Sequence, residues 1–167
     1  MSISFLPRII TDELTDLTPA LLDRRGIRLL MMDFDNTIVP YTTNIPTEKM
    51  AAWLAEMSRS HIQLCVVSNS RSGRVQVFCE KYGIPVITRA KKPGTRGIRE
   101  ALAKFAVAPE AAAMVGDQIF TDTLGGNRAG VTTILVRAIH NHNIWLKLRH
   151  VAELPFIFAA RRRRITK

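Results

Sequence analysis

Two aspartates, Asp33 and Asp35, stand one residue apart in the stretch "MMDFDNTIVPY", directly after an apolar run. A second acidic pair, Asp117 and Asp122, follows another apolar run in "GDQIFTD". Carboxylates that converge on one spot repel one another and take up protons unless a cation neutralises them. The two pairs therefore predict a cation site, provided that the fold brings them together.

The expected cation is a hard divalent metal ion. The candidate ligands are oxygen atoms, and no His or Cys stands near them in the sequence. Mg²⁺ prefers one or two carboxylates together with the oxygens of a phosphate group. Phosphoryl transfer suits such a site, because the metal ion offsets the negative charge that otherwise keeps a carboxylate from attacking phosphorus.

Further polar residues follow other apolar runs. Ser68 and Asn69 end "IQLCVVSNS", and Lys92 stands in "RAKKPG". A hydroxyl and a cation can hold phosphate oxygens, while Asp35 can give a proton to the leaving oxygen and later take one from water. Alternatively, Ser68 and Asn69 cap the helix that follows them, and Lys91 competes with Lys92 for the same role.

These residues need a scaffold that gathers the ends of several strands. Short apolar segments alternate with segments of helical periodicity, which predicts parallel strands joined by right-handed crossovers. The expected fold is a three-layer, doubly wound α/β sandwich with a five-stranded sheet of order 3-2-1-4-5, in which ligands bind where the first and fourth strands end. Strands are expected at 27–32, 62–67, 85–88, 112–116 and 132–136, and helices at 18–26, 47–60, around 75–78, at 98–105 and near 121–129.

Four motifs, "DFDNT", "VVSNS", "AKKP" and "VGDQIFTD", occur in this order after the expected strands. The sequence thereby resembles the phosphatases of the haloacid dehalogenase (HAD) superfamily. The resemblance implies that Asp33 is the nucleophile and that Asp35 is the general acid and base. It also implies metal ligands at Asp33, Asp35 (through its backbone carbonyl) and Asp117, phosphate-binding residues at Ser68, Asn69 and Lys92, and supporting residues at Asp122 and Thr37.

Two longer segments are similar to one branch of that superfamily. "LTPALLDRRGIRLLMMDFDNTIVPY" and "GDQIFTDTLGGNRAGVTTILV" resemble the YqeG branch of class IIIA phosphatases, whose eukaryotic relatives act as mitochondrial phosphatidylglycerophosphate phosphatases. The resemblance implies a Mg²⁺-dependent phosphomonoesterase that converts phosphatidylglycerophosphate to phosphatidylglycerol. A soluble phosphomonoester, such as a nucleotide, a sugar phosphate or a phosphoprotein, is the alternative substrate.

No cap domain is expected over the site. Many relatives insert one after the first motif or between the third and fourth strands, but only a helix and its loops fit into either interval here. An open site admits a bulky or surface-bound substrate, whereas a lid excludes water around a small one. The spacing therefore favours a lipid head group or a macromolecule.

The positive charge of the chain is concentrated near its end. The 167 residues, 47% of them apolar, suit one domain, which we expect to be a phosphatase core at 1–137 followed by a basic extension at 138–167. Of the net charge of +10, the segment 137–167 carries most, with eight Lys or Arg against the single acid Glu153. The expected partner of this segment is anionic.

The extension reads as an amphipathic helix over 144–151, ended by Pro155, and a polyarginine run at 161–164. Such a pattern is typical of binding to an anionic membrane surface. The alternatives are a helix packed on the core with solvated arginines, or contact with RNA. In the RNA reading the protein is a basic RNA- or ribosome-associated binder with a vestigial acidic site.

The sequence also bears on location. Its apolar stretches are much shorter than the roughly 20 residues that cross a bilayer, and "MSISFLPRII" lacks the pattern of a secretory signal. Two cysteines, Cys65 and Cys79, do not make a disulfide framework. We expect a cytoplasmic protein. The basic extension favours a peripheral position at the inner face of the membrane.

Overall fold

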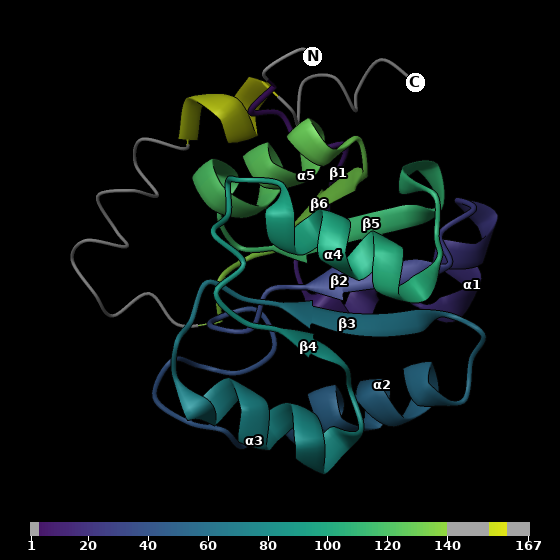
Figure 1. Ribbon diagram of the computed structural model, residues 1–167, viewed down its shortest axis with the longest axis vertical. Coiled ribbons are helices and arrows are strands. Elements are labelled where there is room, and N and C mark those ends of the chain that lie inside the picture. Colours follow the sequence, from purple (N-terminus) through teal and green to yellow (C-terminus); the bar gives the residue numbers. More distant parts are fainter. Residues whose placement is uncertain (1–3, 140–153, 160–167) are drawn as a thin grey trace.

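The computed structural model describes residues 4–139 and 154–159. Its centre is a sheet of six parallel strands in the order β1-β6-β5-β2-β3-β4 (Figure 1). The strands are β1 (Ile9–Ile10), β2 (Leu29–Met32), β3 (Gln63–Val67), β4 (Val86–Ile87), β5 (Ala112–Gly116) and β6 (Thr132–Leu135). The predicted α/β sandwich with a parallel sheet is confirmed.

Five of these strands have the predicted order, since β4-β3-β2-β5-β6 corresponds to 3-2-1-4-5. The expected number of five strands is wrong, because β1 adds a sixth strand beside β6. Backbone N–H groups of Arg8 and Thr11 donate to the carbonyls of Thr133 and Leu135, each at 3.0 Å. A strand of two residues is too short to leave an apolar pattern in the sequence, which explains why it was missed.

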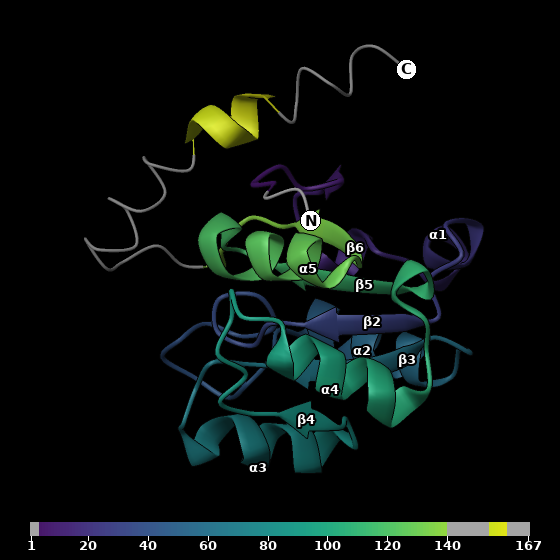
Figure 2. The same ribbon diagram turned by 45° about the horizontal axis from the view of Figure 1, so that its top comes forward.

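Helices cover both faces of the sheet (Figure 2). One face packs against α1, α2 and α3, and the other against α4 and α5. The helices are α1 (Pro19–Arg24), α2 (Glu48–Ser58), α3 (Gly73–Tyr82), α4 (Arg96–Phe105) and α5 (Leu124–Ala129), with short helical turns η1 (Leu14–Asp16), η2 (Pro109–Ala111) and η3 (Ile119–Thr123).

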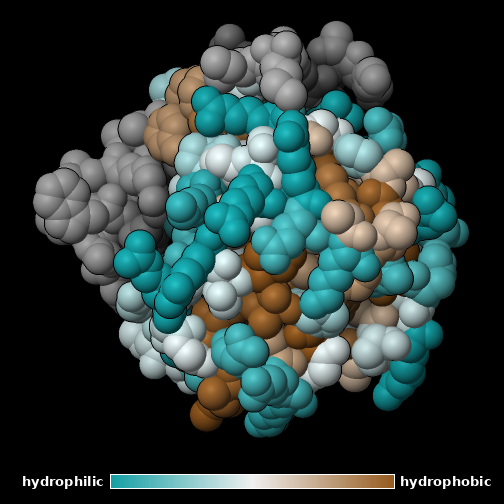
Figure 3. Space-filling view, in the orientation of Figure 1, coloured by the Kyte–Doolittle hydropathy of each residue, from teal (hydrophilic) through white to brown (hydrophobic). Residues whose placement is uncertain are grey.

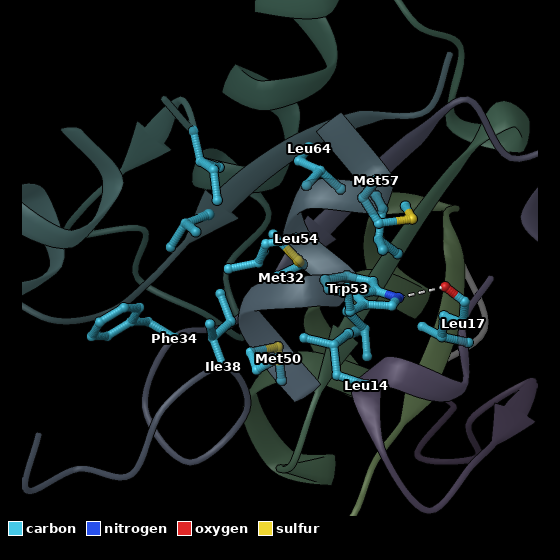
Figure 4. Packing of buried hydrophobic residues seen from close by; sticks show 14 of the residues in the cluster. Leu14, Leu17, Met32, Phe34, Ile38, Met50, Trp53, Leu54, Met57 and Leu64 are labelled. Atoms are coloured by element: carbon cyan, nitrogen blue, oxygen red, sulfur yellow. Dashed lines mark hydrogen bonds between the residues drawn. The ribbon is translucent and has the colours of Figure 1, made fainter. Parts of the chain in front are cut away.

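The sheet is apolar on both faces because it is buried on both. In β2, Leu30 and Met32 belong to the core beneath α2, whereas Leu29 and Met31 belong to the core beneath α4. Figure 4 shows the first of these cores around Trp53 of α2, whose indole N–H donates to the carbonyl of Leu17 at 2.9 Å. A Trp ring can be buried this deeply because its single polar group finds a partner.

The helix ends follow the expected signals. The side chain of Thr18 accepts a hydrogen bond from the Leu21 N–H, Pro19 opens α1, and Gly26 has a left-handed φ of 70° after its end. The cap of α3 is Ser72, which accepts from the Arg74 N–H. The alternative reading of Ser68 and Asn69 as helix caps is therefore wrong.

The intervals in which caps are inserted hold no extra domain. Only α2 lies between β2 and β3, and only α4 and η2 lie between β4 and β5. The prediction of an uncapped core is confirmed. Within residues 4–139 and 154–159, no helix has the length and apolar character that crossing a bilayer requires.

Most of the basic extension lies outside the described residues. The predictions of an amphipathic helix at 144–151 and of solvent- or membrane-facing arginines at 161–164 thus stay predictions. Residues 154–159, yellow in Figures 1 and 2, form a helix with Pro155 in its first turn. The ring of Phe156 lies 5.2 Å from that of Phe5 and 6.1 Å from that of Phe120, so this helix packs on the domain.

Candidate active site

Asp33 of the first acidic pair and Asp117 of the second meet because β2 and β5 are neighbours. The register pairs Met32 with Val115, and the backbone N–H of Asp33 donates to the Val115 carbonyl at 2.9 Å. Asp33 and Asp117 therefore leave adjacent strands at the same edge of the sheet. This edge is where ligands bind in open parallel sheets.

Lys92 links the acids of the site. Its Nζ lies 2.6 Å from Asp33 Oδ1 and 2.7 Å from Asp122 Oδ1. The lysine and Asp122 side chains are each only 2% exposed, and that of Asp33 is 11% exposed. A buried charge needs a charged partner, and here one ammonium group serves two carboxylates. Lys91 next to it is exposed, which leaves Lys92 as the lysine inside the site.

Burial and charge act in opposite directions on these groups. Burial alone lowers the pKa of Lys92, but the charges of Asp122 and Asp33 raise it above its usual value, so the side chain stays a cation. Burial raises the pKa of Asp122 to about 6, although Lys92 opposes this shift. An additional cation among the acids would favour their ionised forms further.

Three carboxylates are close enough to share a metal ion. Asp33, Asp117 and Asp122 each offer one oxygen, and these oxygens lie within 4.8 Å of one another. Oxygen donors alone suit a hard divalent ion such as Mg²⁺. The residues present thus fit the predicted metal, with Asp122 inside the cluster rather than behind it. The predicted contribution of the Asp35 backbone carbonyl stays a prediction.

Asp122 owes its position to two features of the turn after β5. It lies in η3, a single π-helical turn, and its Oδ2 accepts a hydrogen bond from the Gln118 N–H at 3.3 Å. A side chain at Gly116 would overlap the Asp122 carboxylate. The glycine therefore makes room for the acid.

Asp35 pairs with Arg74 of α3, whereas Lys92 pairs with Asp33 and Asp122. The guanidinium of Arg74 also lies 5.0 Å from the centre of the Phe34 ring and 5.3 Å from that of Tyr41, and it donates to the Thr43 carbonyl at 2.7 Å. Through these contacts one arginine fixes both the acid and the loop that follows it.

The remaining predicted residues lie at the same edge. Ser68 is buried, and its Oγ accepts a hydrogen bond from the Ser70 N–H at 3.1 Å. The Asn69 side chain is bonded to the backbone of Lys92. The Thr37 hydroxyl is buried and makes no hydrogen bond within the described residues. The contacts of Ser68 and Asn69 with substrate and the supporting role of Thr37 stay predictions.

Sequence reasoning missed Arg74 and Gly116. Arg74 lies 39 residues from Asp35, in a helix with no motif, so no signal in the sequence pointed to it. Gly116 directly precedes Asp117 inside "VGDQIFTD", and the need for a small residue beside a crowded acid was the available signal.

Comparison with known proteins decides the family. The probable phosphatase YqeG of Bacillus subtilis (strain 168) is 36% identical over 132 residues, which are 79% of this chain and 77% of that protein. The chain belongs to the YqeG branch of the HAD-like phosphatases. A HAD-hydrolase-like family model also matches residues 89–143 of this YqeG-branch protein. It is therefore a phosphatase, as predicted.

Two eukaryotic proteins are more distantly similar to this member of the YqeG branch. Phosphatidylglycerophosphate phosphatase 1, chloroplastic/mitochondrial, of Arabidopsis thaliana is 29% identical over 170 residues, covering 95% of this chain and 45% of that protein. Phosphatidylglycerophosphatase GEP4, mitochondrial, of Saccharomyces cerevisiae is 29% identical over 146 residues, covering 78% of this chain and 77% of that protein.

Solved structures show the same fold. An uncharacterized protein from Listeria monocytogenes matches this YqeG-branch phosphatase with a TM-score of 0.56 at 16% identity, over 71% of this chain and 84% of that one. The cobalt-bound deoxy-D-mannose-octulosonate 8-phosphate phosphatase of Haemophilus influenzae matches with a TM-score of 0.54 at 15% identity, over 75% of both chains. At these identities the likeness concerns the fold alone.

Proposed function

We propose that this phosphatase hydrolyses the terminal phosphomonoester of phosphatidylglycerophosphate through a phosphorylated Asp33, with Mg²⁺ bound by the acidic cluster. The observation that carries the chemistry is the gathering of Asp33, Asp117 and Asp122 within 4.8 Å, with Lys92 in contact with two of them. The substrate is supported by the names of the two eukaryotic relatives and by the uncapped core.

The metal ion, when bound, would supply charge neutralisation between the carboxylates and the substrate phosphate. Asp33 is the attacking acid in this proposal. One carboxylate oxygen forms a bond to phosphorus while the bond from phosphorus to the leaving alcohol breaks. Lys92 and Ser68 hold the other phosphate oxygens, which carry negative charge throughout the transfer.

Asp35 moves the protons in both half-reactions. It donates a proton to the departing alcohol oxygen, and it takes a proton from the water that next attacks the phosphorus of phospho-Asp33. Cleavage of that acyl phosphate releases inorganic phosphate and restores the Asp33 carboxylate. The contact with Arg74 keeps the Asp35 carboxylate in one orientation between these steps.

The basic extension supports a peripheral position at an anionic membrane, where the substrate resides. The helix at 154–159, within this extension, packs beside Phe120 of η3, on the turn that holds Asp122. In this proposal the extension brings the open site to the lipid surface. The RNA-binding alternative depends on the same charges and has no support from the relatives.

The experiment measures phosphate release by the purified protein with Mg²⁺. The substrates are short-chain phosphatidylglycerophosphate, glycerol 3-phosphate, a nucleotide and an aryl phosphate, and chelation of the metal should stop turnover of all of them. Asp33→Asn should abolish activity, whereas the exposed control Asp23→Asn should not. Full turnover by Asp33→Asn would refute the nucleophile, and preference for a soluble ester would refute the lipid substrate.

A further inference from the structure

A cavity of about 570 Å³ opens next to the loop that carries Lys92. Its walls come from the loop after β3, the loop after β4 and the first turns of α4. Figure 3 shows hydrophilic side chains over this part of the surface, at the start of α4 and the loops beside it. We call it the basic pocket, because its charged lining residues are Arg71, Arg89, Lys91 and Arg96 against the single acid Glu100.

The cations of the basic pocket have no anionic partner within residues 4–139 and 154–159: none of the four forms an ion pair with a carboxylate there. All four residues are exposed, so their charges face the cavity and solvent. Like charges held around one space repel one another, and an anion placed between them removes that repulsion. The pocket is therefore suited to an anion that the protein itself does not provide.

The backbone that carries two of these side chains is fixed by its surroundings. Arg89 and Lys91 have left-handed φ angles of 53° and 57°, which residues other than glycine seldom adopt. The segment is tied to the end of β3, because the Ala90 N–H donates to the Ser68 carbonyl at 3.0 Å and the Arg89 N–H to the Ser70 carbonyl at 3.2 Å. Unusual conformations of this kind persist where the surroundings impose them, often at binding sites.

The same segment serves the active site. Lys92 is buried against Asp33, whereas its neighbour Lys91 is exposed and lines the basic pocket. Across the loops, Ser68 is likewise buried and Arg71 exposed. The site around Asp33 and the basic pocket are thus built from the same two loops, each of which gives a buried residue to the site and exposed cations to the pocket.

We propose that the basic pocket binds the second phosphate of the substrate. This inference rests on the proposed function: phosphatidylglycerophosphate carries a terminal phosphomonoester, which reacts, and a phosphodiester one glycerol unit away, which remains in the product. Arginine presents paired N–H groups that match the oxygens of a phosphate, so three arginines and a lysine suit this ligand. The pocket thereby distinguishes a substrate with two phosphates from a simple phosphomonoester.

The test uses a double variant that carries both Arg89→Gln and Arg96→Gln. Its control is Arg99→Gln, at an exposed position of α4 outside the pocket lining. The measured quantity is the ratio of kcat/KM for monomeric short-chain phosphatidylglycerophosphate to kcat/KM for an aryl phosphate. We expect this ratio to fall at least tenfold in the double variant, because KM for the lipid rises. In Arg99→Gln the ratio should stay at the wild-type value. Arg71→Gln, in a loop, provides the same test if the double variant does not fold.

Each other outcome overturns the assignment in a recognisable way. If the wild type hydrolyses the aryl phosphate but not the lipid, the proposed substrate fails and the second-phosphate site fails with it. If the wild type hydrolyses the lipid and the pocket variants keep its ratio, the pocket assignment alone is wrong. A loss seen only on vesicles containing anionic lipid, and not with the monomeric lipid, means that the pocket binds the bilayer surface instead of the substrate.

Discussion

Asn69 and Lys92 are joined by two hydrogen bonds: the Lys92 N–H donates to Asn69 Oδ1 at 2.7 Å, and Asn69 Nδ2 donates to the Lys92 carbonyl at 2.9 Å. Asn69 thus fixes the backbone of Lys92, whose buried side chain reaches Asp33. Asn69 was predicted from its motif to contact phosphate. Its observed hydrogen bonds give it the further task of positioning Lys92.

Replacing Asn69 with Ala should loosen this connection. Loss of two partly buried hydrogen bonds should lower the free energy of unfolding by about 1–3 kcal/mol. Turnover of an aryl phosphate should fall as well, because Lys92 is no longer held against Asp33. Urea denaturation and steady-state kinetics check both effects, and Gln76→Ala, at an exposed position of α3, is the control. Wild-type stability in Asn69→Ala would contradict the positioning role.

Lys92→Ala should be among the most destabilising substitutions in the site. It leaves the carboxylates of Asp33 and Asp122 buried without their cation, which should lower the free energy of unfolding by about 3–5 kcal/mol. Mg²⁺ should raise the melting temperature of this variant more than that of the wild type, because the metal replaces the missing charge.

The double variant Lys92→Ala with Asp122→Asn separates charge from packing. If the loss comes from unpaired charge, removing one carboxylate restores part of the stability, which thermal unfolding measures. No recovery in the double variant, together with no extra effect of Mg²⁺ on Lys92→Ala, would show that the lysine acts through packing.

Gly116→Ala should disturb the acidic cluster without changing any charge. The added methyl group overlaps the Asp122 carboxylate, and such overpacking should lower the free energy of unfolding by about 1–3 kcal/mol. Activity should fall because Asp122 leaves the cluster. Gly73→Ala is the matched control, since a methyl group there has nothing within 4 Å and lies in a helix, where Ala is favoured.

Arg74→Gln should release the loop at 40–44. The variant loses the ion pair with Asp35 and the bonds to the carbonyls of Thr43 and Pro40. Because a hydrogen bond from a charged group contributes about 1.5–3 kcal/mol, cleavage by chymotrypsin after the exposed Tyr41 should become about tenfold faster or more. Arg59→Gln, an exposed arginine after α2, should leave the rate unchanged.

The two thiols predict how stability depends on alkaline pH. Burial raises the pKa of both Cys65 and Cys79 from 9.0 to about 12. In the unfolded chain they ionise near pH 9, whereas in the folded chain they stay protonated, so their contribution to stability is complete below pH 9 and is lost as pH rises from 9 toward 12. The free energy of unfolding should fall less steeply across this range in the double variant that carries both Cys65→Ala and Cys79→Ala.

In the wild type, a thiol reagent at pH 8 should label neither cysteine until the protein unfolds.

The sequence was informative wherever a feature is local. Apolar runs followed by acids predicted the strands and placed Asp33 and Asp117 at one edge, because parallel strands end on the same side of a sheet. Contacts between distant segments leave no such pattern. The pairing of Asp35 with Arg74 depends on the direction of a long side chain, and the inclusion of Asp122 in the cluster depends on a π-helical turn. Neither feature has a local signature in the sequence.

The edge strand β1 has a consequence for synthesis of the chain on the ribosome. Arg8 bonds to Thr133, 125 residues later, so the first strand has no neighbour until nearly the whole core has been made. Asp33 likewise pairs with Lys92, which also pairs with Asp122, and both of these residues are translated much later. Nascent chains that stop short of β6 therefore expose the unpaired edge of the five-residue apolar strand β5, whereas the finished sheet ends on that side in the two-residue β1.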